Sequence, residues 1–179
     1  MMHPSETYKL VFPDETYSEA WHRAVDALRE TDGKIIPANL DAPDFPSFLE
    51  NVRNLAAGRG LPEGYVPSEL YFLVREDAPG EILGVTDLRL DTTAAIEEYF
   101  GHAGGCILPR YRRMGLGTHI IRLSAQKLRQ KGFSSFIVTC ESWNTASRRA
   151  ILANGGVFLG NSQLGEKTYE RYRIRLDAE

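Results

Sequence analysis

Residues 112–118 have the types and spacing best suited to chemistry, because they form a basic, glycine-spaced turn that opens directly into a helical pattern. Gly115 and Gly117 lack a Cβ atom, so backbone N–H groups at the helix start can approach an anion closely. Thr118 adds a hydroxyl donor. The turn lies within residues 99–140, which hold seven Lys or Arg and no Asp or Glu. This pattern predicts a binding site for a polyanionic phosphate ligand.

The turn does not match two common nucleotide-binding motifs. The third glycine of a dinucleotide-binding loop is absent, and so is the Gly-Lys-Ser/Thr of a P-loop. A six-residue glycine pattern alone also fits a tight strand-to-helix turn. The elements around the turn must therefore decide what it binds.

The composition is that of one soluble globular domain, which we expect to span residues 1–179. The chain has 42% hydrophobic and 25% charged residues, and its pI of about 5.9 argues against general nucleic-acid binding. No apolar run approaches the roughly 18 residues of a membrane span, and no signal-peptide pattern is present. Cys106 and Cys140 fall in apolar, strand-like runs, as expected for reduced thiols of a cytoplasmic protein.

The elements that must position the turn alternate between helical and strand-like periods. Residues 135–140 form a continuous apolar run, as in a strand buried on both faces. This order predicts a mixed α/β fold. We expect strands at 8–12, 70–74, 81–90, 102–108, 135–140 and 167–176, and helices at 14–32, 44–57, 116–131 and 144–154.

A longer arrangement of residues makes the turn more specific. A strand, Pro109, the turn, a helix and a buried strand are followed by Asn144-x-x-Ser147 on the next helix, with Gly155 behind it. Across residues 70–158 this arrangement resembles the GNAT superfamily of acyl-CoA-dependent N-acetyltransferases. Tracts such as Asn154-Gly155-Gly156 resemble one bacterial subgroup of predicted acetyltransferases.

The resemblance implies an α+β fold and acetyl-CoA as donor. The fold would be a single mixed, mainly antiparallel sheet with helices on both faces and a V-shaped splay between strands 102–108 and 135–140. The pantetheine arm would lie in the splay like an added strand, and the turn would hold the pyrophosphate. Lys127, Lys131, Arg148 and Arg149 are candidates for the 3′-phosphate, each with the alternative of a solvated helix face. The implied donor-binding residues are Ile107, Leu108, Arg112, Arg113, Met114, Gly115, Leu116, Gly117, Thr118, Asn144 and Ser147.

One of these residues has a structural alternative, and the helix that follows it lacks a proton donor that the resemblance leads us to expect. Asn144 also suits an N-cap of the helix that follows. Many GNAT members carry a Tyr on that helix that protonates the leaving thiolate. The register puts Ile151 at its position, and Ile151 cannot donate a proton. Tyr111 and Cys140 are alternative proton donors, with ordinary roles as a loop aromatic and a core thiol.

The catalytic base is open between two residues. His102 titrates near neutral pH and begins the strand that lines the donor cleft, although a strand-end histidine can also be purely structural. Glu141 ends the buried strand, and it also suits a solvated loop acid. No Cys/His spacing suggests a zinc site, and no metal is expected.

The expected reaction is direct acetyl transfer from acetyl-CoA to a primary amine of a small molecule or peptide, in a ternary complex. The alternatives are a CoA-binding regulatory module without turnover, favoured by Ile151, and transfer of another acyl group such as succinyl. Residues 34–68 should cover the acceptor side. Residues 1–98 carry 19 acidic and 8 basic side chains, a net charge of −11, which favours cationic acceptors. Family members often dimerise through their C-terminal strands, so a homodimer is also expected.

Overall fold

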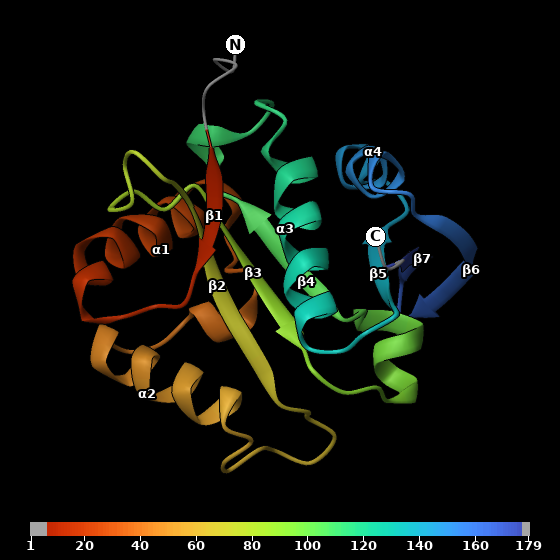
Figure 1. The fold of residues 1–179 in the computed structure, drawn as a ribbon, viewed down its shortest axis with the longest axis horizontal. Helices are drawn as coiled ribbons and strands as arrows, with labels where there is room; N and C mark the ends of the chain where they lie inside the picture. The colour runs from red at the N-terminus through yellow and green to blue at the C-terminus, as the bar shows by residue number, and fades with distance from the viewer. Residues whose placement is uncertain (1–6, 177–179) are drawn as a thin grey trace.

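The computed structural model describes residues 7–176, in which seven strands form two sheets (Figure 1). The four-stranded sheet has the order β1-β2-β3-β4, and the three-stranded sheet has the order β5-β7-β6. All neighbouring strands within each sheet pair antiparallel. The strands are β1 (Tyr8–Val11), β2 (Ser68–Arg75), β3 (Gly84–Arg89), β4 (Ala103–Ile107), β5 (Ser135–Glu141), β6 (Val157–Leu164) and β7 (Lys167–Arg175).

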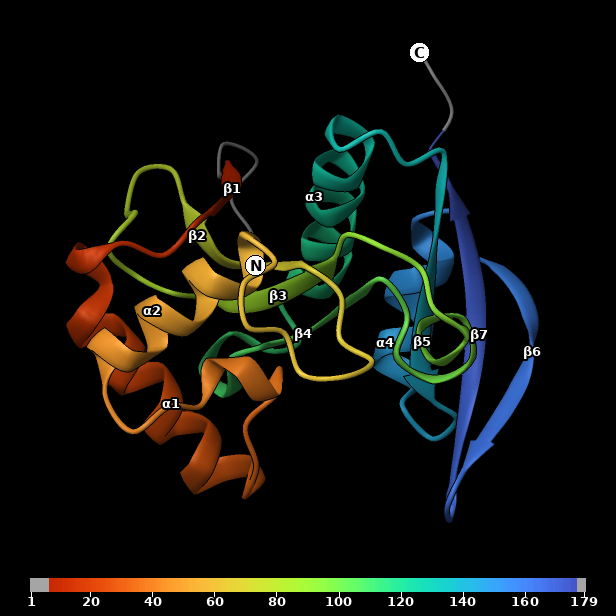
Figure 2. The same ribbon diagram turned by 90° about the horizontal axis from the view of Figure 1, so that it is seen from below.

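Helices cover both faces of the four-stranded sheet. The helices α1 and α2 lie on one face and α3 lies on the other, while α4 packs beside α3 near β5 (Figure 2). No helix within residues 7–176 combines the length and the apolar composition needed to cross a membrane. The helices are α1 (Ser18–Asp32), α2 (Phe45–Ala56), α3 (Leu116–Gln130) and α4 (Thr145–Ala153), joined by the short turns η1 (Glu15–Tyr17), η2 (Ala38–Leu40), η3 (Ile96–Phe100) and η4 (Pro109–Tyr111).

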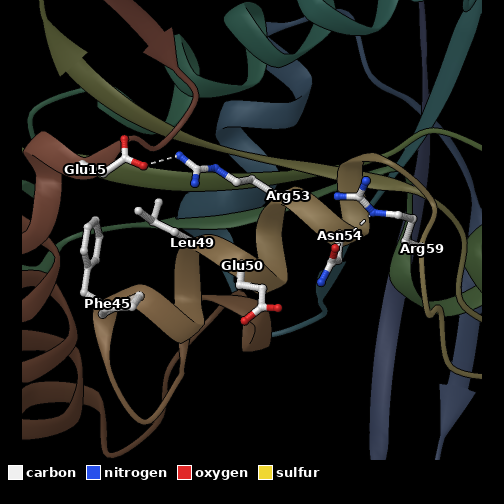
Figure 3. Close-up of a pocket in the computed structure, with 8 residues that line it drawn as sticks. Glu15, Phe45, Leu49, Glu50, Arg53, Asn54 and Arg59 are labelled. Carbon is white, nitrogen blue, oxygen red and sulfur yellow. Dashed lines mark hydrogen bonds and ion pairs between the residues drawn. The ribbon is translucent and has the colours of Figure 1, made fainter.

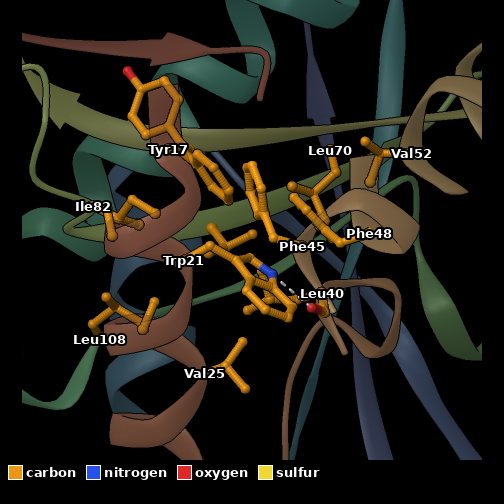
Figure 4. Close-up of a cluster of buried hydrophobic side chains, with 14 of the residues drawn as sticks. Tyr17, Trp21, Val25, Leu40, Phe45, Phe48, Val52, Leu70, Ile82 and Leu108 are labelled. Carbon is orange, nitrogen blue, oxygen red and sulfur yellow. Dashed lines mark hydrogen bonds between the residues drawn. The ribbon is translucent and has the colours of Figure 1, made fainter. Parts of the chain in front are cut away.

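An aromatic core fixes α1, α2 and η2 to the sheet (Figure 4). Phe48 stacks against Phe72 of β2 with 6.0 Å between ring centroids. The indole Nε1 of Trp21 donates to the carbonyl oxygen of Leu40 at 3.0 Å. Complete burial of one such side chain contributes about 1.5–3 kcal/mol. The connection between α1 and α2 is therefore held firmly at η2.

Local sequence signals explain where the helices begin and end. Asp44 caps α2, because its Oδ1 accepts the N–H of Ser47 at 2.8 Å. Gly33 ends α1 in the left-handed conformation, with φ of 65°. The second core, on the α3 face, contains Leu116 and Leu128 of that helix. Burial of Leu116 and Leu128 holds α3 against the sheet, and η4 is the short connection between the end of β4 and the first turn of α3.

The structure confirms the mixed α/β fold with antiparallel strands and helices. Strand pairing is interrupted between β4 and β5, where the splay was expected, so the described strands form two sheets. The sequence did not predict β6, whose residues are mostly exposed and whose pairing with β7 is irregular between Phe158 and Gly160. An edge strand of this kind lacks the clean alternation of apolar and polar residues on which strand prediction depends.

Candidate functional site

The strands β4 and β5 run side by side at their starts and then diverge, leaving a fork between the two sheets (Figure 1). On the β4 side, the N–H of Leu108 donates to the carbonyl of Leu83 in the segment before β3, at 2.9 Å, and the carbonyl of Leu108 accepts the N–H of Tyr111 at 2.9 Å. Alternate residues of an antiparallel strand point to opposite edges. Gly105 and Ile107 therefore direct their backbone groups into the fork. Leu108, expected to contact the donor arm, already has partners for both backbone groups.

On the β5 side, the same alternation leaves Thr139 facing the fork. Just past β5, the N–H of Ser142 donates to the carbonyl of Thr168 in β7 at 2.9 Å, which places the even-numbered positions of β5 on the β7 side. The hydroxyl of Thr139 donates to the carbonyl of Tyr99 at 2.8 Å. The fork is thus bordered by two strand edges with backbone groups available for an extended ligand.

The turn of residues 112–118 lies where β4 leads into α3. The guanidinium of Arg112 binds both carboxylate oxygens of Asp32, with Nη1 at 2.8 Å from Oδ1, and its Nε donates to the carbonyl of Ile107 at 3.0 Å. This bidentate pairing lowers the pKa of Asp32. The side chain of Arg112 therefore anchors the turn to the end of α1. Sequence reasoning missed Asp32, because it treated Asp32-Gly33 only as a helix end.

The glycines give the turn its shape. Gly115 caps α3 at its N-terminus with φ of 78°, and Arg113 also has a positive φ, of 63°. Gly117 has ordinary backbone angles, and a Cβ atom built on it would meet Cβ of Ala150 at 3.6 Å, an ordinary contact. The N–H groups of the first helical turn have no partner inside a helix, and the helix dipole makes this end positive. The arrangement suits a pyrophosphate.

The other expected residues of the turn divide between surface and core. Arg113 and Met114 are exposed, whereas Leu116 is buried and fixes the start of α3 in the core. The N–H of Thr118 donates to the carbonyl of Gly115 at 3.1 Å, which leaves the Thr118 hydroxyl as its remaining donor. The turn thus offers a ligand mainly backbone groups rather than side chains.

Asn144 is the N-cap of α4. Its Oδ1 accepts the N–H of Ser147 at 3.1 Å, and its own N–H donates to the carbonyl of Glu141 at 2.8 Å. Its side-chain Nδ2 has no hydrogen-bond partner within residues 7–176. Ile151, at the position of the family's tyrosine, is completely buried in the core. The α4 helix therefore supplies one free amide donor and no acid at that position.

The two candidate bases lie in very different environments. His102 is 4% exposed, its Nδ1 accepts the N–H of Ile137 at 3.0 Å, and its Nε2 lies 2.9 Å from Oγ1 of Thr92. Burial lowers the pKa of His102. Glu141 accepts a hydrogen bond from Lys167 at 2.6 Å, which lowers the pKa of this carboxyl group. Both ring nitrogens of His102 are therefore engaged, and Glu141 is ionised at neutral pH.

The two candidate proton donors both remain protonated at neutral pH. Burial, with the hydrogen bond to Glu81, raises the pKa of Tyr111 to about 12. Burial, with the nearby charge of Glu170, raises the pKa of Cys140 to about 11. Tyr111 lies in η4 and Cys140 in β5, on the two sides of the fork.

Most basic residues proposed for the 3′-phosphate are already paired. Lys131 binds Glu69 at 2.5 Å, Arg148 binds both carboxylate oxygens of Glu170 at 2.7 Å, and Lys127 lies 4.9 Å from the centroid of the Tyr71 ring. Lys127 is eleven residues along α3 from Leu116, about 16 Å from the turn at 1.5 Å per residue. Within residues 7–176, Arg149 is the member of this set without an ion pair or ring contact.

A surface pocket of about 420 Å³ lies elsewhere, along the outer side of α2 (Figure 3). Arg53 pairs with Glu15 across it at 2.8 Å, and Arg59 Nε donates to Asn54 at 3.2 Å. No lining residue comes from β4, β5 or α3. This pocket is therefore separate from the fork. Within residues 7–176, no group of three or more His, Cys, Asp or Glu side chains could hold a metal ion.

Solved structures share this fold over nearly their whole length. One is a microcin C7 self-immunity acetyltransferase in complex with acetyl-CoA and AMP, with TM-score 0.69, 17% identity and coverage of 96% of this chain and 93% of that one. Another is a ribosomal L7/L12 α-N-protein acetyltransferase in complex with coenzyme A, with TM-score 0.68, 16% identity and coverage of 97% and 96%. A third is a proposed acetyltransferase from Salmonella typhimurium with its cofactor acetyl-CoA, with TM-score 0.60, 14% identity and coverage of 96% and 95%.

No curated protein sequence matches the chain significantly. The sequence model described as "Acetyltransferase (GNAT) family" matches residues 25–155, which include α2, the four-stranded sheet from β2 onward, the turn, α3, β5 and α4. Together with the fork and the glycine-spaced turn, this match shows that the chain belongs to the GNAT family of acetyltransferases.

Proposed function

We propose that this protein transfers the acetyl group of acetyl-CoA to a primary amine by direct attack in a ternary complex. The observation that carries the proposal is the fork itself. Within residues 7–176 it has backbone groups without a partner on both edges, at Gly105 and the N–H of Ile107 on one side and at Thr139 on the other, and it leads to the N-terminus of α3. An extended pantetheine arm would complete the fork as an added strand, with the pyrophosphate on the turn.

Different residues of the chain would bind different parts of the donor. Backbone N–H groups of residues 113–117 and the Thr118 hydroxyl would hold the pyrophosphate, and Arg149 would approach the 3′-phosphate. The N–H of Ile107 would pair with the arm, while its carbonyl stays with Arg112. The free Nδ2 of Asn144 would donate to the arm near the thioester. Arg112 itself supports this site through Asp32 rather than by contact with phosphate.

The proposed chemistry needs a neutral amine but no covalent enzyme intermediate. Glu141 is ionised and stands at the end of β5, so it would receive the amine proton, directly or through water. His102 was the other candidate base, but both of its ring nitrogens are engaged, so the proposal gives the role of base to Glu141. Tyr111 and Cys140 would be available to protonate the departing thiolate.

A second candidate function is a CoA-binding regulatory module without turnover. The complete burial of Ile151 favours it, because the usual proton donor of the family is replaced by a core residue. Thiol release from acetyl-CoA in the presence of an amine panel separates the two. Binding with no thiol release for any amine would favour the module. Faster thiol release from succinyl-CoA than from acetyl-CoA would instead identify succinyl as the preferred acyl group.

Donor binding is tested first by thermal shift with acetyl-CoA, CoA and ATP. A ligand at 100 times its Kd adds about 2.7 kcal/mol to the free energy of unfolding. We expect stabilisation by acetyl-CoA and CoA and none by ATP at the same concentration. Equal stabilisation by ATP would refute a site shaped for the pantetheine arm.

The acceptor side would be walled by residues 34–68. The hydrogen bond from Lys167 is the main cause of the lowered pKa of Glu141, and the positive charge of Lys34, the first residue of this segment, adds to it. The net charge of −11 in residues 1–98 supports cationic acceptors. Asp41 pairs with Arg29 at 2.6 Å, so it contributes less to this field. Equal rates for a cationic and an anionic amine of similar size at low salt would refute the preference.

A homodimer is supported by the edge strand β6. Val157, Phe158 and Leu159 on this strand are 60%, 54% and 37% exposed, and β6 is the outer strand of its sheet. A second copy of the chain would cover these side chains. Light scattering after size exclusion should give a dimer that Phe158→Glu converts to a monomer. A monomeric wild-type protein at micromolar concentration would contradict it.

A further inference from the structure

His102 joins the two sheets at the closed end of the fork, where β4 and β5 start side by side, through two hydrogen bonds. The backbone N–H of His102 donates to the carbonyl of Ile137 at 2.7 Å, and the backbone N–H of Ile137 donates to Nδ1 of the His102 ring at 3.0 Å. Both backbone groups of one β5 residue are therefore bound by His102, one by its main chain and one by its side chain. Beyond this point no ladder pairs β4 with β5 in residues 7–176.

The chain just before His102 is pressed tightly onto β5. A Cβ atom on Gly101 would approach the carbonyl oxygen of Ile137 to 2.8 Å and the nitrogen of Thr139 to 3.2 Å, and Gly101 has φ of 66°. Tyr99 accepts the Thr139 hydroxyl hydrogen bond nearby. The imidazole has a further contact on each side, because its Nε2 lies 2.9 Å from Oγ1 of Thr92 and the ring of Phe133 lies edge-on at 5.5 Å between centroids.

The imidazole takes the place of a backbone carbonyl that would accept a hydrogen bond between two paired strands. In a continuous parallel ladder, the N–H groups of Ile137 and Thr139 would both donate to backbone carbonyls of the neighbouring strand. Here Nδ1 of His102 takes the N–H of Ile137, and the carbonyl of His102 accepts the N–H of Arg89 in β3 at 2.7 Å, so it does not pair with Thr139. Pairing therefore stops after one pair of residues, and β4 diverges from β5. The backbone groups of Gly105 and the N–H of Ile107 consequently have no partner within residues 7–176, while the Ile107 carbonyl accepts Nε of Arg112.

We propose that His102 is a positioning residue that sets the closed end of the fork, and through it the width of the groove that receives the donor arm. This rests on the proposed binding of acetyl-CoA in the fork. It assigns His102 a role that needs no contact with the reacting atoms.

The two hydrogen bonds between His102 and Ile137, called the clamp from here on, require a neutral imidazole with its hydrogen on Nε2. Nδ1 must accept from Ile137, so Nε2–H donates to the Thr92 hydroxyl. A second proton would sit on Nδ1 and face the Ile137 N–H, donor against donor. The charged groups near the ring are Glu97 and Asp91, which favour protonation, and Arg89, which opposes it together with burial. Acid should therefore open the clamp, and donor affinity should fall as pH drops below the usual histidine range.

The test compares two variants that each keep one half of the ring's geometry. In His102→Asn, Oδ1 stands where Nδ1 was and can still accept the Ile137 N–H, but it does not titrate. In His102→Gln, the polar atoms reach toward Thr92 and leave Ile137 without an acceptor. His22→Gln, at an exposed position on α1, is the matched control. The readouts are hydrogen exchange of the Ile137 amide and the Kd for acetyl-CoA from pH 5 to pH 8.

We expect His102→Asn to keep slow exchange at Ile137 and to bind acetyl-CoA within threefold of the wild type, with no weakening in acid. His102→Gln should exchange at least tenfold faster at Ile137 and bind at least tenfold more weakly, with kcat unchanged at saturating donor. Fast exchange in His102→Gln with wild-type affinity would overturn the proposal. So would a loss of kcat in His102→Asn at normal affinity, which would make His102 the base.

Two measurements keep the proposal falsifiable on other grounds. If His102→Gln fails to fold, the wild type still decides, because protection at Ile137, corrected for intrinsic exchange, should fall between pH 7 and pH 5. Constant protection would overturn the clamp. If no form of the protein binds acetyl-CoA, the proposed function fails, while the exchange difference between the Asn and Gln variants still supports or refutes the clamp.

Discussion

Replacing Gly117 by Ala should have opposite effects on the fold and on donor binding. The glycine has ordinary backbone angles, and the added methyl would meet only Cβ of Ala150 at 3.6 Å. The unliganded protein can therefore accommodate it. Because Gly in a helix costs roughly 0.5–1 kcal/mol relative to Ala, the variant should be the more stable of the two. At about 2–4 °C per kcal/mol for a chain of this size, Tm should rise by about 1–4 °C.

Acetyl-CoA binding should fall in the same variant. The added methyl would lie on the first turn of α3, facing Ala150 of α4. It would stand beside the N–H groups that are proposed to hold the pyrophosphate. Loss of one charge-assisted hydrogen bond costs about 1.5–3 kcal/mol, a roughly 10- to 150-fold rise in Kd. Calorimetric titration with acetyl-CoA measures this directly, and differential scanning calorimetry gives Tm.

Two variants serve as controls for this prediction. Gln126→Ala, at an exposed position further along α3, should leave Kd unchanged. Gly115→Ala should lower Tm, because φ of 78° costs an L-residue about 1–2 kcal/mol. A Gly117→Ala protein that is folded and binds acetyl-CoA with wild-type affinity would refute the assignment of the pyrophosphate to this turn.

Further substitutions test the anchor, the buried acid and the acceptor side. Asp32→Asn should lower the free energy of unfolding by about 1 kcal/mol at pH 7, because the pair with Arg112 is partly exposed. Since the pKa of Asp32 is lowered in the folded state, the difference in unfolding free energy between wild type and variant should vanish as the pH falls through that pKa. Urea titrations at pH 7 and pH 3 would show this. Asp87 is buried on β3 and burial raises its pKa, so above that pKa its charged form lowers the free energy of unfolding of the wild type. The advantage of Asp87→Asn over the wild type in unfolding free energy should therefore shrink as the pH is lowered from 7 to 4. A constant difference would contradict this. Trp143 is 70% exposed and donates to Glu141, so Trp143→Ala should raise the acceptor KM severalfold and leave the donor Kd and Tm unchanged. Steady-state kinetics measure this KM. A change in Tm with no change in KM would instead show that the role of Trp143 is purely structural.

The sequence predicted the elements that have strong periodic patterns. The helices α1 and α3 and the strand β5 were found within a few residues, because apolar residues recur at the proper period and Gly33 and Gly132 mark helix ends. The splay was expected from family resemblance rather than from any pattern in the strands. The irregular edge strand β6 was missed.

The contacts of several side chains expected at the donor site differ from those that the sequence suggested, and the location of that site stays a prediction. Arg112 was expected on the phosphate, but a carboxylate 80 residues away, on Asp32, holds it. Arg148 and Lys131 looked like free cations, although Glu170 and Glu69 pair with them. Charge pairing across distant elements leaves no local pattern. The backbone groups that border the fork carry no sequence signal at all, because they depend on where pairing stops.

Asp32 is the last residue of α1, and the chain passes directly from it into the segment that would wall the acceptor side. One ion pair therefore connects the turn of residues 112–118 to the segment proposed as the acceptor wall. A change at either end of this pair would reach both proposed binding sides. Donor binding and acceptor binding would then be coupled through the support that they share, without any contact between the two substrates.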